Sequence, residues 1–366
     1  MAVRLYDGAD VTRCRLYTTW RASLVNFLDS QRLERRNPVE AARHWLEEHD
    51  RIALATVVST WGSAPVPVGG QLAVAPGERF EGSVSGGCAE VDVITEATDV
   101  IAEGRVRLLE FGVAEETAWR AGLPCGGTIK VLFEPLERKR DAAFLDFILE
   151  MQRARQPLVV ITNVATGARQ VLEEGGSRLS PEVADCLSSG KSRLVETREG
   201  ECFVHALVPA VRLIIAGATH VGQVLADLAH KIGYDVIVID PRSAFTTEER
   251  FGETQTVNAW PEAPLATLGL DARTALVALT HAAHIDDEAL ATALRSPCLY
   301  VGALGSKRTQ ANRVERLKAR GFSEADLARI HAPVGLAIGA EGPAEIAVSI
   351  LAEIIKVAHG GSDARA

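Results

Sequence analysis

In the second half of the chain, short unbroken runs of apolar residues alternate with helical patterns. The run 213–216 has the length and composition of a buried strand, and apolar residues at helical spacing follow it up to Ile232. Further strands are expected at 235–239, 274–279 and 298–301. Helices are expected at 287–294, 307–319 and 343–357. Strands that alternate with helices in this way predict a parallel, doubly wound sheet.

The turn after the first of these strands has the glycines of a dinucleotide-binding unit. Gly217 allows a tight exit from the strand, and Gly222 lets the next helix pack closely on the sheet. Asp240 ends the following strand, where such units place an acid that binds a ribose; without a nucleotide it would cap the strand end. Thr219, just before His220, replaces the glycine that lets a diphosphate approach the backbone. The pattern predicts a Rossmann-like fold and leaves nucleotide binding open.

The first half of the chain mixes strands, hairpins and helices. Asn37, Pro38 and Glu40 form the signature of a helix N-terminus. Strands are expected at 52–59, 72–75, 80–84, 106–111, 128–133, 158–164, 169–173, 193–197 and 202–208, and helices at 37–49, 89–102 and 141–153. Residues 1–36 lack such a pattern and are interpreted as an N-terminal extension. We therefore expect a mixed α/β domain over 37–208 and a Rossmann-like domain over 209–360.

Composition and charge narrow the range of functions. The 366 residues are enough for two domains, each with its own core. With 39 Lys and Arg against 48 Asp and Glu, the net charge of −9 argues against a nucleic-acid partner. No apolar run approaches the length of about 18 residues that a transmembrane helix needs, and the N-terminus lacks the apolar segment of a signal peptide. The six cysteines form no CxxC pair, which is typical of reduced thiols. We expect a cytoplasmic protein that binds neither nucleic acid nor membrane.

Two loops of the first domain share one design, a cysteine beside two glycines. One loop contains Ser85, Gly86, Gly87 and Cys88, and the other contains Cys125, Gly126 and Gly127. Adjacent glycines free the backbone to present consecutive N–H groups to an anion. Cys88 is expected in the first turn of a helix, where the helix dipole favours an anionic thiolate. The alternative is that both cysteines are small apolar residues in tight turns.

A third glycine loop, at 302–308, follows a strand and begins a helix. Its last four residues, Gly305, Ser306, Lys307 and Arg308, offer free helix N–H groups and two cations, a combination that suits an anion. The alternative is a solvated first turn in which Ser306 caps the helix.

A polar loop follows the strand at 274–279, at the edge where open α/β sheets bind ligands. His281, His284 and a neighbouring aspartate could bind a metal, although no third histidine completes a zinc set. The alternative is that Asp286 or Asp287 caps the next helix.

Together these motifs resemble the XdhC/CoxI family, accessory proteins that mature molybdenum-containing hydroxylases such as xanthine dehydrogenase. The matching stretches lie at 55–65, 82–88, 122–128, 300–308, 329–336 and 338–350, so that the resemblance covers residues 38–358. Thr219 departs from the glycine that family members often have there. Residues 1–36 have no counterpart.

The resemblance implies a protein that binds the molybdenum cofactor (molybdopterin), protects it during sulfuration and delivers it to an apo molybdenum hydroxylase. It also implies a cysteine desulfurase as partner and a homodimer. Cys88 and Cys125 become candidate molybdenum ligands, because a soft metal–sulfur centre suits thiolates. No acid–base set for turnover is recognisable, which favours a chaperone over an enzyme. The alternatives are an NAD(P)-dependent oxidoreductase that uses the Rossmann-like domain and a scaffold that only bridges partner proteins.

Overall fold

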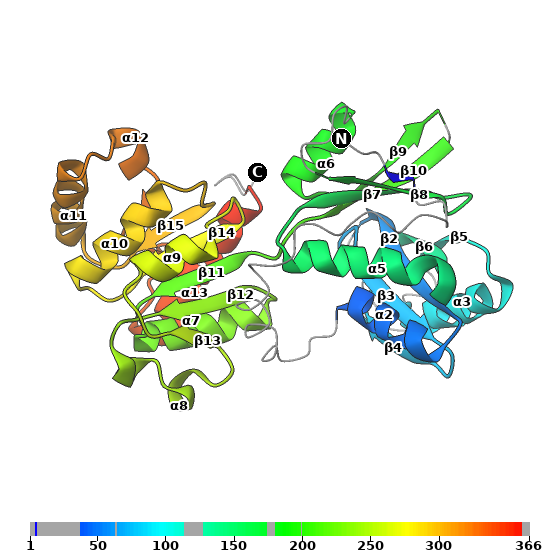
Figure 1. The fold of residues 1–366 in the computed structure, drawn as a ribbon, viewed down its shortest axis with the longest axis horizontal. Helices are drawn as coiled ribbons and strands as arrows, with labels where there is room; N and C mark the ends of the chain where they lie inside the picture. Colours follow the sequence, from blue (N-terminus) through cyan, green and yellow to red (C-terminus); the bar gives the residue numbers. More distant parts are fainter. Residues whose placement is uncertain are drawn as a thin grey trace. The chain divides into compact units, whose positions relative to one another are not determined.

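A computed structural model describes residues 4–5, 37–62, 64–112, 127–173, 180–198 and 200–360. The chain falls into two units, Met1–Pro209 and Ala210–Ala366, whose elements are shown in Figure 1. Apart from a two-residue strand, β1 (Arg4–Leu5), the expected N-terminal extension lies outside the described residues.

The first unit contains two five-stranded antiparallel sheets. One has the order β4-β3-β2-β6-β5, formed by β2 (Arg51–Trp61), β3 (Gln71–Ala75), β4 (Arg79–Gly82), β5 (Arg107–Gly112) and β6 (Thr128–Glu137). The other has the order β1-β8-β7-β10-β9, formed by β1 with β7 (Leu158–Asn163), β8 (Arg169–Glu173), β9 (Arg193–Thr197) and β10 (Gly200–Leu207). The helices are α2 (Pro38–Glu48), α3 (Glu90–Glu103), α5 (Arg138–Arg153) and α6 (Pro181–Ser189).

The long central strand β2 shows why this unit folds as it does. Its residues alternate between two cores: Ala53 and Val57 face the core that contains α3, while Ile52 and Leu54 face the core that contains α2 and α5. The predicted start of α2 is confirmed, because the side chain of Asn37 accepts a hydrogen bond from the N–H of Val39 at 3.0 Å.

A β-bulge interrupts the pairing of β2 with β6. Val57 lies opposite Val131, but the next pair is Ser59 with Lys130, so Val58 has no partner in this ladder. The regular pairing resumes beyond it and ends with Trp61 opposite Thr128.

The second unit is built on a six-stranded parallel sheet of order β13-β12-β11-β14-β15-β16. The strands are β11 (Arg212–Ala216), β12 (Asp235–Ile239), β13 (Gln255–Val257), β14 (Thr274–Ala278), β15 (Tyr300–Ala303) and β16 (Ile330–His331). Counted along the chain this order is 3-2-1-4-5-6, the order of the Rossmann fold, and it confirms the predicted fold class. The switch point, where ligands bind in such sheets, lies between β11 and β14.

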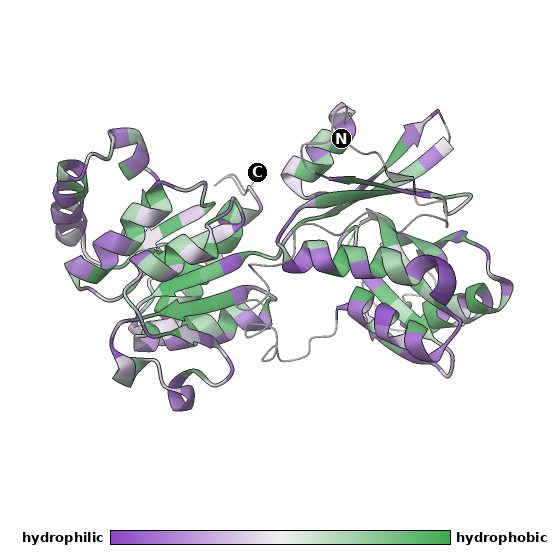
Figure 2. Cartoon of the chain, in the orientation of Figure 1, coloured by the Kyte–Doolittle hydropathy of each residue, from purple (hydrophilic) through white to green (hydrophobic). Residues whose placement is uncertain are grey.

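Helices cover both faces of this sheet, which explains its unbroken apolar strands. Leu213 and Ile215 pack against α7 (His220–Lys231) and α13 (Gly342–Ala358). Ile214 and Ala216 pack on the opposite face with α9 (Glu262–Leu268), α10 (Ala283–Leu294) and α11 (Lys307–Ala319). Figure 2 shows the central strands as the most hydrophobic part of the unit.

The remaining elements of the second unit are short. They are η1 (Ser243–Phe245), α8 (Glu248–Phe251) and α12 (Glu324–Leu327). The helix expected from residue 287 begins earlier, at Ala283. Within the parts of the chain that the structure describes, no helix is long and apolar enough to cross a membrane.

Candidate functional site

Three motif-bearing segments of the first unit meet at one end of the β2–β6 ladder. Trp61, which precedes the first motif loop, pairs with Thr128, which follows the second cysteine loop. Pro65 lies against the Cys88 loop, since a Cβ on Gly86 would be 3.1 Å from its Cγ. Gly127 directly precedes β6, whereas Cys125 and Gly126 lie outside the described residues.

The loop before α3 forms the predicted anion cradle, and the carboxylate of Glu90 fills it. Glu90 Oε1 accepts hydrogen bonds from the N–H of Ser85 at 2.9 Å and from the hydroxyl of Ser83 at 2.6 Å. Glu90 Oε2 accepts from the N–H of Gly87 at 2.7 Å and from the hydroxyl of Ser85. Gly86 and Gly87 have φ values of 75° and 115°, which glycine adopts without strain. The anion in this cradle therefore belongs to the chain itself.

Cys88 lies just before the helix, not in its first turn as predicted. Helix α3 begins at Glu90 with Ala89 as its N-cap, which places Cys88 one residue further out. The hydroxyl of Ser85 accepts a hydrogen bond from the N–H of Ala89 at 2.8 Å, and so satisfies a backbone donor next to the start of the helix. Cys88 is a free, exposed cysteine. Its thiol is therefore accessible. The N–H of the preceding Gly87 donates to Glu90, so this N–H is not free to bind an external anion.

Replacing Glu90 with glutamine tests the role of this carboxylate. Burial raises the pKa of Glu90, but the hydrogen bonds from Ser83, Ser85 and Gly87 outweigh burial and lower the pKa to about 2. We expect Glu90→Gln to lower the free energy of unfolding by about 1–3 kcal/mol at pH 7, since an amide N–H would face the N–H donors. Solvent around this partly exposed group favours the lower end of the range.

The difference in stability between wild type and Glu90→Gln should depend on pH. A carboxyl with a lowered pKa stabilises the fold fully above its unfolded value of 4.5, and that stability is lost as pH falls towards 2. Urea denaturation should therefore show a smaller difference between wild type and Glu90→Gln at pH 3 than at pH 7. The exposed Glu150→Gln serves as control. A difference that does not change with pH would contradict this assignment.

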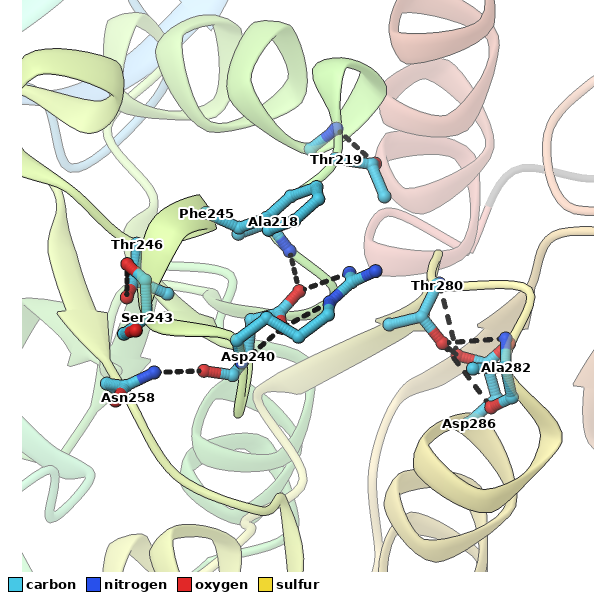
Figure 3. A network of polar contacts seen from close by, with 12 residues as sticks. Ala218, Thr219, Asp240, Ser243, Phe245, Thr246, Asn258, Thr280, Ala282 and Asp286 are labelled. Atoms are coloured by element: carbon cyan, nitrogen blue, oxygen red, sulfur yellow. Dashed lines mark hydrogen bonds and ion pairs between the residues drawn. The ribbon is translucent and has the colours of Figure 1, made fainter.

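The glycine turn of the second unit has the predicted close contacts. Gly217 has a φ of 123°, and a Cβ there would lie 2.7 Å from Thr280 Cγ2 and 3.0 Å from Thr280 N. A Cβ on Gly222 would lie 2.7 Å from the carbonyl oxygen of Gly217. Thr219 is the N-cap of α7, and its hydroxyl accepts from the N–H of Gly222 at 3.2 Å, as Figure 3 shows. The exposed His220 is the first residue of the helix.

Asp240 is fully buried, and its carboxylate is occupied by hydrogen bonds from the chain (Figure 3). Oδ2 accepts from the N–H of Ala218 at 2.8 Å and from Arg242 Nη2 at 2.6 Å. Oδ1 accepts from the N–H of Arg242 at 2.9 Å and from its Nε at 2.8 Å. Burial raises the pKa of Asp240, but these bonds outweigh it and lower the pKa. Asp240 thus ties the end of β12 to the glycine turn, as the strand-cap interpretation expects.

In the loop at 302–308, a serine side chain caps the helix that follows. Ser306 is the N-cap of α11, and its hydroxyl accepts from the N–H of Thr309 at 3.2 Å. Gly305 has a φ of 138°. Lys307 and Arg308 are exposed, and neither forms an ion pair with the residues that the structure describes. Ser306 thus caps the helix as the alternative expects, and the two cations remain accessible beside the cap.

The loop after β14 is held by hydrogen bonds and shows no metal site. Asp286 Oδ1 accepts from the hydroxyl of Thr280 at 2.6 Å and from its N–H at 3.1 Å (Figure 3). Asp287 pairs with Arg316. The ring of His284 lies 5.6 Å from that of Trp260. No three His, Cys, Asp or Glu side chains within the described segments form a group that could hold a metal ion.

Comparison with known proteins places this geometry in a family. Residues 45–112 match the XdhC and CoxI family, and residues 213–354 match the XdhC Rossmann domain. The molybdenum cofactor insertion chaperone PaoD of Escherichia coli (strain K12) is 30% identical over 310 residues, which cover 83% of this chain and 82% of that protein. The chain belongs to the XdhC/CoxI family.

Two further relatives of this XdhC/CoxI protein extend the comparison. A protein of Bacillus subtilis (strain 168), named as a probable subunit of xanthine dehydrogenase, is 29% identical over 321 residues, covering 85% of this chain and 94% of the relative. A crystal structure described as a xanthine dehydrogenase from Bacillus halodurans superposes with a TM-score of 0.69 at 24% identity. It covers 90% of this chain and 98% of that one, and at this identity it shows the shared fold.

Two residues that shape the candidate sites of this XdhC/CoxI protein, Glu90 and Arg242, were not predicted from the sequence. Glu90 lies three residues after Gly87, close enough for its side chain to reach back to the N–H groups of the loop. This spacing could have suggested that a carboxylate of the chain itself binds them. Arg242 stands two residues after Asp240, where an arginine is a known signal of phosphate binding in Rossmann folds.

Proposed function

We propose that this XdhC/CoxI protein binds the molybdenum cofactor and delivers it to an apo molybdenum hydroxylase of the xanthine dehydrogenase type. The observation that carries the proposal is the likeness to a molybdenum cofactor insertion chaperone over most of both chains. The relative named as part of a probable xanthine dehydrogenase supports the class of partner.

Cys88, in the loop before α3, is the proposed contact with the metal. Its exposed thiol stands where the motif segments meet, and thiolates are the ligands that a soft molybdenum–sulfur centre prefers. Cys125, with Gly126 and Gly127, is proposed as the second contribution to the same contact. In this arrangement Glu90 holds the loop in the shape that presents Cys88.

The cradle at Ser85 and Gly87 has no free N–H group for the phosphate of a pterin, because Glu90 already occupies it. In the second unit, Lys307 and Arg308 offer accessible cations beside the first turn of α11. Charge-assisted contacts from such groups are the strong ones for a phosphate. Within the second unit, the loop that ends with these two residues is therefore proposed as an anion site.

The remaining features of the proposal follow from the family resemblance. The cofactor stays bound while its terminal sulfur ligand is installed, and a cysteine desulfurase supplies the sulfur. An exposed Cys88 suits a site that partner proteins must reach. The protein is proposed to act as a cytoplasmic homodimer, without catalysing a reaction of its own.

The alternative is an NAD(P)-dependent oxidoreductase, which the Rossmann strand order favours. One contact weighs against ordinary NAD binding: both oxygens of Asp240 already accept hydrogen bonds from the chain, so neither is free for a ribose. His281, at the strand end, forms no hydrogen bond with an acid among the residues described. Hydride transfer to or from a bound nucleotide would favour this alternative.

Direct measurement of cofactor tests the chaperone proposal. The protein purified from a molybdenum-replete host should carry molybdenum and a pterin that is detected after oxidation, in similar molar amounts. Adding the loaded protein to an apo hydroxylase should restore the activity of that enzyme. A preparation without metal or pterin that also fails to bind added cofactor would refute the proposal.

A further inference from the structure

The carboxyl end of β12 differs from a ribose-binding site in one decisive respect. In Rossmann units that bind NAD, the acid at this position accepts hydrogen bonds from ribose hydroxyls. Here both oxygens of Asp240 accept from the N–H of Ala218 and from three donors of Arg242, at 2.6–2.9 Å. A carboxylate that four donors already satisfy has little left to offer a ribose hydroxyl.

We propose that Arg242, held over Asp240, selects a nucleotide with a phosphate on its adenosine ribose, so that the second unit binds NADP-type ligands in preference to NAD. The inference concerns the second unit alone. It holds whether or not the first unit carries the molybdenum cofactor.

The guanidinium of Arg242 is fixed in position and remains accessible. Its Nε and Nη2 bind Asp240, while Nη1 makes no hydrogen bond within the parts of the chain that the structure describes. The side chain is 38% exposed. Its guanidinium carbon lies 4.2 Å from the ring centroid of Phe245, so that an aromatic ring supports one face of the group. A planar cation held by an acid and a ring is pre-organised for a phosphate.

A second cation and a hydroxyl lie close to Arg242. Asp240 neutralises one cation, but Arg250 adds a second, at 5.2 Å from the same Phe245 ring. Arg250 is held in place by Gln223 Oε1 at 2.9 Å and by the carbonyl of Phe245 at 3.1 Å. The exposed Ser243 follows Arg242 directly, and no hydrogen bond of its hydroxyl to another described residue is found. A phosphate could thus meet a guanidinium and a hydroxyl from neighbouring residues.

This group stands beside the switch point of the sheet. The N–H of Ala218 joins Asp240 to the turn after β11, and Gly217 in that turn lies against Thr280 after β14. Figure 3 shows Asp240 and Phe245 on one side of this region and Thr280 on the other. Dinucleotides lie across this crevice with the adenosine ribose at the end of the second strand, which is β12 here. The ribose phosphate of NADP would therefore meet Arg242.

Calorimetric titration tests the proposal on the full chain. The probes are NADP⁺ and NAD⁺, with adenosine 2′,5′-bisphosphate and 5′-AMP as fragments that do or do not carry the ribose phosphate. We expect each phosphorylated ligand to bind at least about tenfold more tightly than its counterpart, since charge-assisted bonds to arginine are strong. Equal affinities, or no binding of either dinucleotide, would overturn the proposal without bearing on the molybdenum experiment.

The variant Arg242→Ala should erase the preference. It removes the cation and frees Asp240 for ribose hydroxyls, so the affinity for NADP⁺ should fall about tenfold or more and that for NAD⁺ should not. Arg105→Ala, which removes an exposed arginine of the first unit, is the charge-matched control. A preference that persists in folded Arg242→Ala would overturn the assignment. If this variant does not fold, the wild-type comparison of the four ligands still decides.

Discussion

Replacing Cys88 with serine is expected to leave the protein folded while delivery of the molybdenum cofactor falls at least about tenfold. The side chain is exposed and nearly isosteric with serine, so the melting temperature should not change. A hydroxyl is a poor ligand for a soft metal–sulfur centre, so binding should weaken even though the loop keeps its shape. Bound molybdenum and activation of an apo hydroxylase, both per folded molecule, measure the effect.

A buried cysteine of the same unit provides the matched control. Cys186 is fully buried in an apolar cluster, and burial raises the pKa of its thiol. Cys186→Ser should therefore cost about 1–3 kcal/mol of stability, because a hydroxyl is placed among apolar side chains, with normal delivery per folded molecule. If Cys88→Ser behaves in the same way, with lower stability and normal delivery, Cys88 has no chemical role.

Replacing Arg169 with methionine is expected to have the largest effect on stability, about 3–5 kcal/mol. Arg169 joins two carboxylates inside the first unit: its Nε donates to Glu134 Oε1 at 2.8 Å and its Nη1 to Asp141 Oδ1 at 2.7 Å. The side chains of Arg169, Glu134 and Asp141 are only 11%, 8% and 4% exposed. Without the cation, two buried negative charges lose their main partner. Urea denaturation at pH 7 measures the loss.

Arg140 is the control for this prediction, because it bonds the same Asp141 from the surface. Its side chain is 49% exposed, and exposed ion pairs contribute little, so Arg140→Met should cost less than about 1 kcal/mol. Replacing all three buried groups, as Arg169→Met with Glu134→Gln and Asp141→Asn, should recover much of the lost stability. Similar losses for Arg169→Met and Arg140→Met would contradict the idea that burial sets the cost.

The elements that the sequence predicted correctly are those whose pattern is set by burial. The runs 213–216 and 235–239 became β11 and β12 because strands covered on both faces need apolar residues throughout. Gly217 and Gly222 were recognisable because any Cβ there would meet backbone atoms. The short edge strands β13 and β16 were missed, since strands of two or three residues carry too little pattern.

The site was less predictable because its contacts depend on loop geometry. The two glycines correctly predicted backbone N–H groups that can bind an anion. Which acceptor binds them depends on how the chain turns after Cys88, and in the structure the acceptor is Glu90. Cys88 was expected in the first turn of a helix over 89–102, but the helix begins one residue later, at Glu90, a usual error at helix ends. Asp240 was identified at its strand end, whereas its saturation depends on the direction that Arg242 takes.

The bulge at Val58 decides which side of the sheet the end of β2 serves. Opposed residues in antiparallel strands point to the same face, so Trp61 shares the face of Thr128, opposite to that of Ile129 and the core around α3. Strict alternation from Val57 would have turned Trp61 towards α3 instead. Gain or loss of one residue at the bulge would thus turn Trp61 to the other face of the sheet. The pairing of β2 with β6 on either side of the bulge would persist.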